Sequence, residues 1–248
     1  MLKVIVNGCL GKMGKVLTRC VQEDEQLELV CGVSLNPIED TSFKLYSKMS
    51  DISESADVII DFSHHSTLYD VLSFALENKT PLVIATTGYN EDELNKIKEA
   101  SKIIPIFHSS NMSLGVNVLL RLVKEASKML NGFDIEVIEK HHNKKVDAPS
   151  GTAIMIANAV KEVLPTIEYN YGRYGREAKR NKNEVGIHAV RGGTIVGEHD
   201  VIYAGHDEIV EIKHLAQSKD IFAKGSITAA KYLVSQVPGY YNMDNMLS

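Results

Sequence analysis

Residues 2–14 read LKVIVNGCLGKMG and decide how the first half of the chain folds. The first five of them predict a short buried strand, and an apolar helical period begins near Lys15. Between these elements, Gly8, Gly11 and Gly14 form a G-x-x-G-x-x-G turn, one residue longer than the usual dinucleotide fingerprint. A strand, a glycine turn and a helix in this order let the backbone approach a pyrophosphate. The stretch indicates a dinucleotide-binding unit, with a turn used only for packing as the alternative.

The rest of the first half repeats this unit. Strands are expected at residues 27–33, 58–61, 82–85 and 103–107, and helices at residues 68–77 and 91–101, the second capped by Asn90. Strands that alternate with helices predict a parallel, doubly wound sheet, whose ligands lie beyond the carboxyl ends of the strands. Polar turns at residues 61–63, 86–88 and 109–111 fall at those ends, so we expect them to face a ligand.

The end of the second strand bears on which dinucleotide binds. An acidic residue is expected there to hold the adenosine ribose of NAD, and Ser34 stands in its place. The next residues provide neither a carboxylate for the ribose nor an arginine for a 2′-phosphate, which leaves the choice between NAD and NADP open. Lys12 could serve a phosphate, and Glu39 and Asp40 are alternative ribose ligands if the turn is longer.

The pattern changes after residue 111. We expect helices at residues 114–130 and 225–236, a strand at 133–138, a polar loop at 169–183, and an antiparallel meander of strands at 184–191, 194–198, 201–204 and 208–215. The sequence therefore predicts an α/β protein. Its Rossmann-like, doubly wound parallel sheet is expected in a dinucleotide-binding domain of residues 1–111 plus 221–248. Residues 112–220 would form a second, α+β domain on a largely antiparallel sheet.

Residues 139–152, EKHHNKKVDAPSGT, place two histidines and three lysines near the end of a predicted strand. Ser150 and the two residues after it open an apolar helix expected at residues 153–164. The free N–H groups and the dipole of that helix suit a small anion, and Lys144 or Lys145 could add a full positive charge. The stretch predicts a binding site for a small acid.

Other functions fit this stretch less well. A basic run such as KHHNKK is often a solvated surface loop. We expect no metal on His141 and His142, because adjacent strand residues point to opposite faces and no third ligand lies at metal spacing. Ser150 lacks the G-x-S-x-G context of a nucleophile, and PSGTA lacks the Gly-Lys of a phosphate loop. The Ser150 hydroxyl is expected to cap the helix or to hold the ligand.

Together these residues resemble the dihydrodipicolinate reductase family, which serves the diaminopimelate route to lysine. The resemblance covers essentially the whole chain and rests on the glycine turn, DFS at 61–63, ATTG at 85–88, SNMS at 110–113, EKHHNKKVDAPSGTA at 139–153, RGGTIVGEH at 191–199 and QSKD at 217–220. It implies reduction of 4-hydroxy-tetrahydrodipicolinate to tetrahydrodipicolinate, with loss of water, by NADH or NADPH.

The resemblance also implies roles for residues. His141 would be the general acid/base, in keeping with a side chain that can give a proton near neutral pH, and Lys145 the other catalytic group. The dicarboxylate substrate would be bound by His142, Ser150, Gly151 and Thr152. Cofactor contacts would come from Gly8, Cys9, Leu10, Gly11, Lys12, Met13, Ala85, Thr86, Thr87, Ser109, Ser110, Asn111 and Met112. Ser34 would face the ribose, where an acidic residue is common in the family.

The composition limits the partners and the cellular compartment that we expect for this chain. The net charge of −5 argues against a nucleic-acid partner, and no apolar run approaches the roughly 20 residues that a membrane span needs. The N-terminal strand leaves no room for a signal peptide, and Cys9, Cys20 and Cys31 lack paired or C-x-x-C spacing, so a reducing cytoplasm is expected. The family resemblance implies a homotetramer. Two alternatives stay open: a dinucleotide-binding sensor without catalysis, and a similar reductase acting on another small acid.

Overall fold

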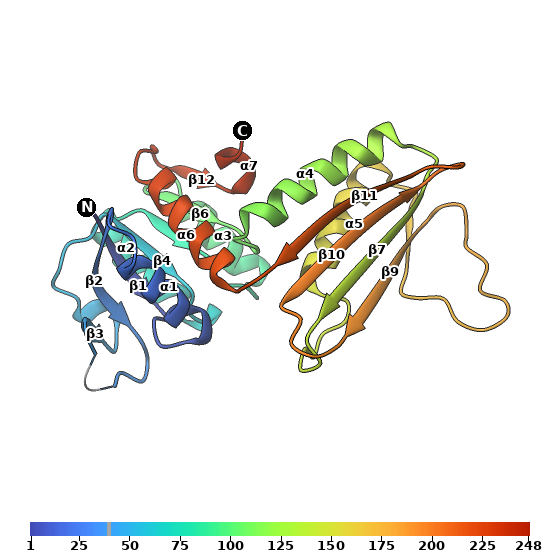
Figure 1. Ribbon diagram of the computed structural model, residues 1–248. Helices are drawn as coiled ribbons and strands as arrows, with labels where there is room; N and C mark the ends of the chain where they lie inside the picture. The colour runs from blue at the N-terminus through green and yellow to red at the C-terminus, as the bar shows by residue number, and fades with distance from the viewer. Residues whose placement is uncertain (39–40) are drawn as a thin grey trace. The chain divides into compact units, whose positions relative to one another are not determined.

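The computed structural model describes residues 1–38 and 41–248, which divide into two compact units (Figure 1). Unit 1 consists of Met1–Leu114 and Lys219–Ser248, and unit 2 of Gly115–Ser218. The chain therefore leaves unit 1, builds unit 2, and returns. The red C-terminal segment in Figure 1 belongs with the blue N-terminal strands for this reason.

Unit 1 is a parallel sheet with helices on both faces. Its elements are β1 (Leu2–Asn7), α1 (Lys12–Gln22), β2 (Leu27–Val33), β3 (Lys44–Tyr46), η1 (Met49–Asp51), β4 (Val58–Asp61), η2 (His65–Thr67), α2 (Leu68–Glu77), β5 (Leu82–Ile84), α3 (Glu91–Ala100), β6 (Pro105–His108), α6 (Asp220–Leu233), β12 (Gly239–Tyr241) and α7 (Met243–Met246). The strand order is β12-β6-β5-β4-β1-β2-β3, and every pairing is parallel. The order reverses between β1 and β4, the switch point where such sheets bind ligands. The predicted doubly wound fold is confirmed.

The apolar run of β1 is buried on both faces of this sheet. Val4 and Val6 belong to the cluster under α1 and α6, whereas Ile5 belongs to the cluster under α2 and α3. Each such side chain contributes about 1.5–3 kcal/mol when it leaves water. A strand buried on both faces reads as continuous rather than alternating apolar sequence, which is why residues 2–6 identify a central strand.

Two helices begin earlier than expected. α1 starts at Lys12 rather than near Lys15, so Gly14 lies inside the helix instead of in the turn. α6 starts at Asp220 rather than at residue 225, and Gly225 lies in its second turn. A Cβ at Gly225 would overlap the carbonyl oxygen of Met112, so this glycine allows the helix to approach the chain closely. In both cases a glycine that was expected to precede or to begin the helix lies inside it.

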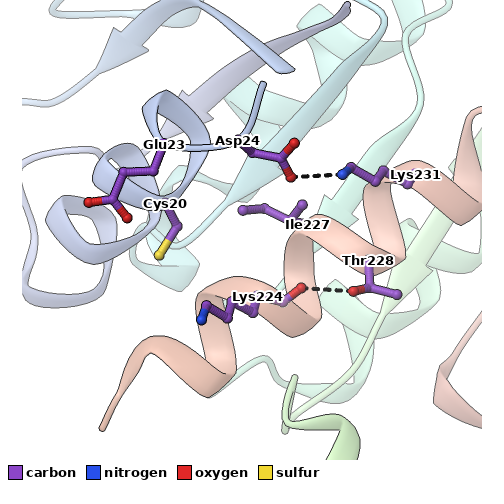
Figure 2. A pocket seen from close by; sticks show the side chains of 7 residues that line it. All are labelled: Cys20, Glu23, Asp24, Lys224, Ile227, Thr228 and Lys231. Atoms are coloured by element: carbon purple, nitrogen blue, oxygen red, sulfur yellow. Dashed lines mark hydrogen bonds and ion pairs between the residues drawn. The ribbon is translucent and has the colours of Figure 1, made fainter. Parts of the chain in front are cut away.

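Polar contacts fasten α6 to the end of α1. Lys231 Nζ donates to Asp24 Oδ2 at 2.7 Å and to Gln26 Oε1 at 2.8 Å, and Arg19 pairs with Asp220 at 2.8 Å. Beside these contacts lies a cavity of about 440 Å³ lined by Cys20, Glu23, Asp24, Lys224, Ile227, Thr228 and Lys231 (Figure 2). The last helix of unit 1 is thus joined to its first helix through both apolar packing and ion pairs.

Unit 2 is built on a mixed sheet. Its elements are α4 (Leu114–Met129), which begins at the last residue of the first segment of unit 1, β7 (Asp134–His141), α5 (Gly151–Val163), β8 (Glu168–Asn170), β9 (Glu184–Arg191), β10 (Gly197–Ala204) and β11 (Ile209–Ala216). The order is β11-β10-β7-β9-β8; β7–β10 and β10–β11 are antiparallel, and β7–β9 and β8–β9 are parallel. Side chains from α4 and α5 complete one apolar core with β7, β9 and β10.

The prediction of an antiparallel meander is wrong in which strands pair with each other. β9 does not pair with β10, because β7 lies between them and pairs with both. The strands expected at 194–198 and 201–204 are instead one strand, β10, that starts at Gly197. Local periodicity does not indicate which strands pair when they are distant in sequence. The crossover connection through α5 makes β7 and β9 parallel.

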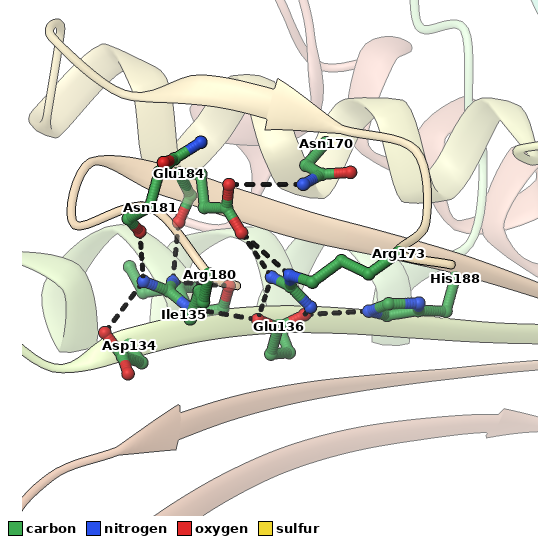
Figure 3. A network of polar contacts seen from close by, with 9 residues as sticks. All are labelled: Asp134, Ile135, Glu136, Asn170, Arg173, Arg180, Asn181, Glu184 and His188. Carbon is green, nitrogen blue, oxygen red and sulfur yellow. Dashed lines mark hydrogen bonds and ion pairs between the residues drawn. The ribbon is translucent and has the colours of Figure 1, made fainter. Parts of the chain in front are cut away.

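The loop expected at residues 169–183 begins with the short strand β8 and is held to the sheet by charges (Figure 3). Glu136 of β7 accepts hydrogen bonds from Arg173 at 2.6 Å and from Arg180 at 3.1 Å, and its Oε2 lies 2.7 Å from His188 Nε2. Burial alone would raise the pKa of Glu136, but these partners outweigh burial and lower it. Arg173 also bonds Glu184, so one guanidinium joins β7, β9 and the loop.

Across residues 1–38 and 41–248, no helix is both long enough and apolar enough to pass through a membrane.

Candidate active site

The glycine turn borders a cavity at the carboxyl ends of β1, β2 and β4. The cavity has a volume of about 320 Å³ and is lined by Asn7, Gly8, Gly11, Val33, Ser34, Leu35, Ser47, Lys48, Met49, Phe62, Ser63, His64, Thr67 and Asp70. Gly8 has φ +79°, and a Cβ there would lie 2.5 Å from the carbonyl oxygen of Phe62, so only glycine fits. Gly11 is the N-cap of α1 and has no side chain to cap it. The open helix end and the adjoining cavity fit the pyrophosphate and ribose of a dinucleotide.

Asp61, at the end of β4, ties neighbouring strand ends together. Its carboxylate accepts hydrogen bonds from Asn7 Nδ2 at 2.8 Å, Thr86 Oγ1 at 2.7 Å and Ser63 Oγ at 2.5 Å. Asp61 is fully buried, and burial raises its pKa while these hydrogen bonds act in the opposite direction. The polar strand ends that we expected to face a ligand are therefore partly internal, with Asp61 and Thr86 holding the edge of the sheet in register.

The expected cofactor residues divide into two groups. Gly8, Gly11 and Ser34 line the cavity. The others do not line it: Cys9, Ala85, Thr86, Asn111 and Met112 are buried, Leu10, Met13 and Ser109 are half-buried, and Lys12, Thr87 and Ser110 are exposed. Lys12 and Met13 form the start of α1. The expected residues in 85–87 follow β5, and those in 109–112 follow β6, at the same edge of the sheet. The alternative ribose acids Glu39 and Asp40 lie outside the described residues.

In unit 2, the carboxylate of Glu139 organises the signature segment. Glu139 is fully buried near the end of β7 and accepts two hydrogen bonds from Arg191, at 2.7 and 2.8 Å. It also accepts the backbone N–H of Ser150 at 2.9 Å, and its Oε2 lies 2.7 Å from His141 Nδ1. Burial alone would raise the pKa of Glu139, but the partners outweigh it and lower the pKa. An ionised Glu139 thus joins the end of β7 to the start of α5.

The imidazole of His141 is held in one orientation. Because the Glu139 carboxylate only accepts hydrogen bonds, Nδ1 of His141 carries the proton. Nε2 makes no hydrogen bond to any residue that the structure describes, and it lies against Gly197, where a Cβ would be 3.0 Å away. The side chain is 12% exposed. One ring nitrogen of His141 is therefore fixed by Glu139, which is the orientation that proton transfer through the other nitrogen would require.

Ser150 links the helix N-terminus to a second buried histidine. Its hydroxyl accepts the N–H of Ala153 at 3.1 Å and lies 3.0 Å from His199 Nε2, so the expected helix cap is confirmed. His199 packs edge-on against His141 with 5.3 Å between ring centroids. Burial, followed by the proximity of His141, lowers the pKa of His199 to about 4. His199 is therefore neutral at physiological pH.

The other predicted substrate residues surround this cluster. Lys145 Nζ donates to Asp147 Oδ1 at 2.8 Å, and Asp147 is largely exposed. His142 is half-buried, and its Nδ1 is buried without a hydrogen-bond partner in the described parts of the chain. Gly151 and Thr152 are the first residues of α5, and nothing lies within 4 Å of the position that a Cβ on Gly151 would take. Gly151 thus leaves space for an anion at the start of α5.

Buried, neutral His199 predicts a fold that weakens in acid. Its pKa is about 4 in the folded state and 6.5 as a free side chain, so below pH 6.5 the unfolded state binds more protons. The contribution to stability is complete above pH 6.5 and is lost as the pH falls through 4, by roughly 3 kcal/mol. We expect His199→Asn to flatten the pH dependence of the unfolding free energy, measured by urea denaturation at fixed protein concentration. A smaller slope remains because burial also lowers the pKa of His108 and of His214, and because the lowered pKa values of Glu136 and Glu139 add a loss of stability at the acid end. Equal slopes in both proteins would contradict the prediction.

Glu139, Arg191 and His199 received no role from the sequence, although each lies in the site. One signal was present: the alternation of β7 places Glu139 on the same face as Ile135 and Val137, which are buried. A carboxylate on a buried face requires a cation or several donors. The identity of that cation, Arg191, depends on β9 pairing with β7, which was not predicted.

A parallel sheet with a glycine turn after its first strand, joined to a second unit that carries an oriented histidine, defines a nicotinamide-dependent oxidoreductase. Comparison with known proteins gives the family. The model described as "Dihydrodipicolinate reductase, N-terminus" matches residues 2–112, and "Dihydrodipicolinate reductase, C-terminus" matches residues 115–247. The chain belongs to the dihydrodipicolinate reductase family.

Individual relatives agree along the whole chain. The 4-hydroxy-tetrahydrodipicolinate reductase of Caldanaerobacter subterraneus subsp. tengcongensis is 54% identical over 248 residues, which cover 100% of this chain and 98% of that protein. The enzyme of the same name from Clostridium tetani is 48% identical, with the same shares covered. A solved structure of dipicolinate-bound dihydrodipicolinate reductase from Paenisporosarcina sp. TG-14 is similar with a TM-score of 0.83 and 21% identity, over 99% of each chain. That structure supports the fold.

Proposed function

We propose that the chain reduces 4-hydroxy-tetrahydrodipicolinate to tetrahydrodipicolinate, with loss of water, using NADH or NADPH in the diaminopimelate route of lysine biosynthesis. Membership of the family supports the assignment of this substrate. The observation that carries the proposal is the orientation of His141, whose Nδ1 is bound to Glu139 while Nε2 stays available beside the open N-terminus of α5. This arrangement places a proton donor next to an anion-binding helix end.

In this proposal the dinucleotide-binding domain is residues 1–111 plus 221–248, and residues 112–220 bind substrate. Bound NADH or NADPH supplies the hydride. Gly8 and Gly11 let the backbone approach the pyrophosphate, and Ser34 faces the adenosine ribose. The further cofactor contacts come from Cys9, Leu10, Lys12, Met13, Ala85, Thr86, Thr87, Ser109, Ser110, Asn111 and Met112, with the buried members contributing through their backbone.

His141 acts as the general acid. Addition of a hydride to a conjugated imine acid leaves electron density that a proton must meet. His141 in its imidazolium form, with a proton on each ring nitrogen, donates that proton from Nε2 and becomes neutral. Glu139 keeps the other proton on Nδ1 and prevents the ring from turning. Arg191 holds Glu139 in place from β9, so it positions the acid without contacting substrate.

Lys145 and the start of α5 bind the substrate carboxylates. Gly151 and Thr152 lie at the positive end of the α5 dipole, and Lys145 adds a full charge. In the absence of substrate, Lys145 is paired with the exposed Asp147, and this hydrogen bond lowers the pKa of Asp147. Because exposed ion pairs are weak, a substrate carboxylate can replace Asp147 at little cost.

The purified chain tests the function in a coupled assay. Substrate is generated by dihydrodipicolinate synthase from pyruvate and aspartate semialdehyde, and oxidation of NADH and of NADPH is followed by absorbance. We expect turnover, and we expect Lys145→Ala to lower kcat/KM by about ten- to hundredfold, since it removes one charged hydrogen bond to the substrate. Lys144→Ala removes the neighbouring exposed lysine and is expected to stay near the parent value. Cofactor binding without turnover would favour a sensor or a reductase for another acid.

We also infer a cytoplasmic homotetramer that assembles through unit 2. Val190 of β9 and Ile209 and Leu215 of β11 are 44%, 64% and 49% exposed. Their register partners place all three on the sheet face that carries Lys140 and Glu198. Exposed apolar residues on one sheet face support an interface between copies of the chain. Three buried, unpaired cysteines support a reducing compartment. Sedimentation as a monomer at assay concentration would contradict the assembly.

A further inference from the structure

The ends of β2 and β3 form one wall of the cavity beside the glycine turn. Val33 is the register partner of Tyr46, and the N–H of Ser34 donates to the carbonyl oxygen of Tyr46 at 3.0 Å. The residues that follow the two strands are therefore neighbours. Ser34, Ser47 and Lys48 all line the cavity, together with Gly8 of the glycine turn. Lys48 is brought there by a short strand that the sequence did not predict.

This wall carries hydrogen-bond donors and a positive charge. Lys48 is exposed and makes no ion pair with any residue in 1–38 or 41–248, whereas Lys44, on β3 itself, is paired with Glu54. The Ser34 hydroxyl stands where a ribose-binding acid is expected. Asp70 supplies a carboxylate to the same lining, but it comes from the first turn of α2 and makes no ion pair with Lys48.

We propose that Lys48, together with Ser34, binds the 2′-phosphate of NADPH and makes the chain prefer NADPH over NADH. The inference rests on the proposed function, because it takes unit 1 to bind a nicotinamide dinucleotide. An ammonium group and a hydroxyl that line the same cavity form a donor set that suits a phosphate. In the usual fingerprint a carboxylate binds the 2′- and 3′-hydroxyls of NADH, and neither Ser34 nor Lys48 supplies a carboxylate.

Two small nucleotides isolate this interaction. 2′,5′-ADP and 5′-AMP differ only in the 2′-phosphate, and calorimetric titration of the chain with each requires no substrate or turnover. We expect 2′,5′-ADP to bind about tenfold or more tightly than 5′-AMP, and Lys48→Ala to remove most of that difference while leaving 5′-AMP affinity unchanged. The matched control is Lys96→Ala, which removes an exposed lysine of α3 that is absent from the cavity lining and should change neither affinity.

Ser34→Asp supplies the complementary test. A carboxylate at this position repels the phosphate and accepts the ribose hydroxyls, so 2′,5′-ADP should bind more weakly and 5′-AMP more tightly than in the parent chain. The inference is overturned if Lys48→Ala leaves the affinity ratio unchanged or weakens both nucleotides equally. Failure of the reductase assay with the affinity ratio intact counts against the reaction and not against Lys48. Turnover with equal affinities for the two nucleotides counts against Lys48 alone.

Discussion

His141→Gln is expected to lower kcat by about 10²- to 10⁴-fold, the usual contribution of a positioned general acid. Glutamine keeps a polar side chain of similar reach, but it cannot release a proton near neutral pH. The hydrogen bond between position 141 and Glu139 can still form, so the fold of unit 2 should survive. Turnover is measured with the substrate-generating assay under saturating NADPH.

The control for His141→Gln is nucleotide affinity. The cavity beside the glycine turn is lined by residues of unit 1 only, so binding of 2′,5′-ADP should be unchanged in the variant. Loss of turnover with intact binding locates the defect in proton transfer. Near-parent turnover would remove His141 from the mechanism and would leave the anion-binding start of α5 as the main function of the segment.

Glu139→Ala is expected to lower the unfolding free energy by about 3 kcal/mol and to reduce turnover as well. The change leaves Arg191 and the Ser150 N–H without their acceptor, and breaking a buried ion pair from one side costs about 3–5 kcal/mol. We expect a loss at the lower end of this energy range because the Arg191 side chain is 20% exposed and can reach water. Urea denaturation of parent and variant at one protein concentration measures the difference.

Two further variants separate stability from catalysis at this position. Glu139→Gln retains an oxygen acceptor for Arg191, so it should lose less stability than Glu139→Ala while still loosening the orientation of His141. Glu125→Ala removes an exposed acid of α4 that pairs with Lys128, and a change within about 0.5 kcal/mol is expected. A loss for Glu125→Ala as large as that for Glu139→Ala would show that burial of the carboxylate is not the cause.

Local signals predicted the elements that local interactions stabilise. Asn90 caps α3 as expected, within a capping box that Glu93 completes, and Ser150 caps α5 as expected. β4 and α2 have the predicted bounds. These features depend on residues a few positions apart, so the sequence displays them directly.

The errors occurred where distant residues meet. The place of β7 between β9 and β10 depends on pairing across long separations, and the contact of Arg191 with Glu139 follows from it. Likewise, Lys48 reaches the cavity only because β3 pairs with β2. The signature segment predicted His141 and Lys145 as catalytic residues, but did not by itself indicate the buried carboxylate of Glu139 that orients His141.

The return of the chain to unit 1 has a consequence for its synthesis on the ribosome. Ala223, Ile227 and Leu233 of α6 belong to the same buried cluster as Val4 and Val6 of β1. All of unit 2 is translated between these segments, so that face of the first sheet lacks one of its two covering helices until α6 emerges. Unit 2 is continuous and can fold as soon as it is released. The first strand to be made is thus among the last to be fully covered, and during that interval its exposed apolar face is open to aggregation.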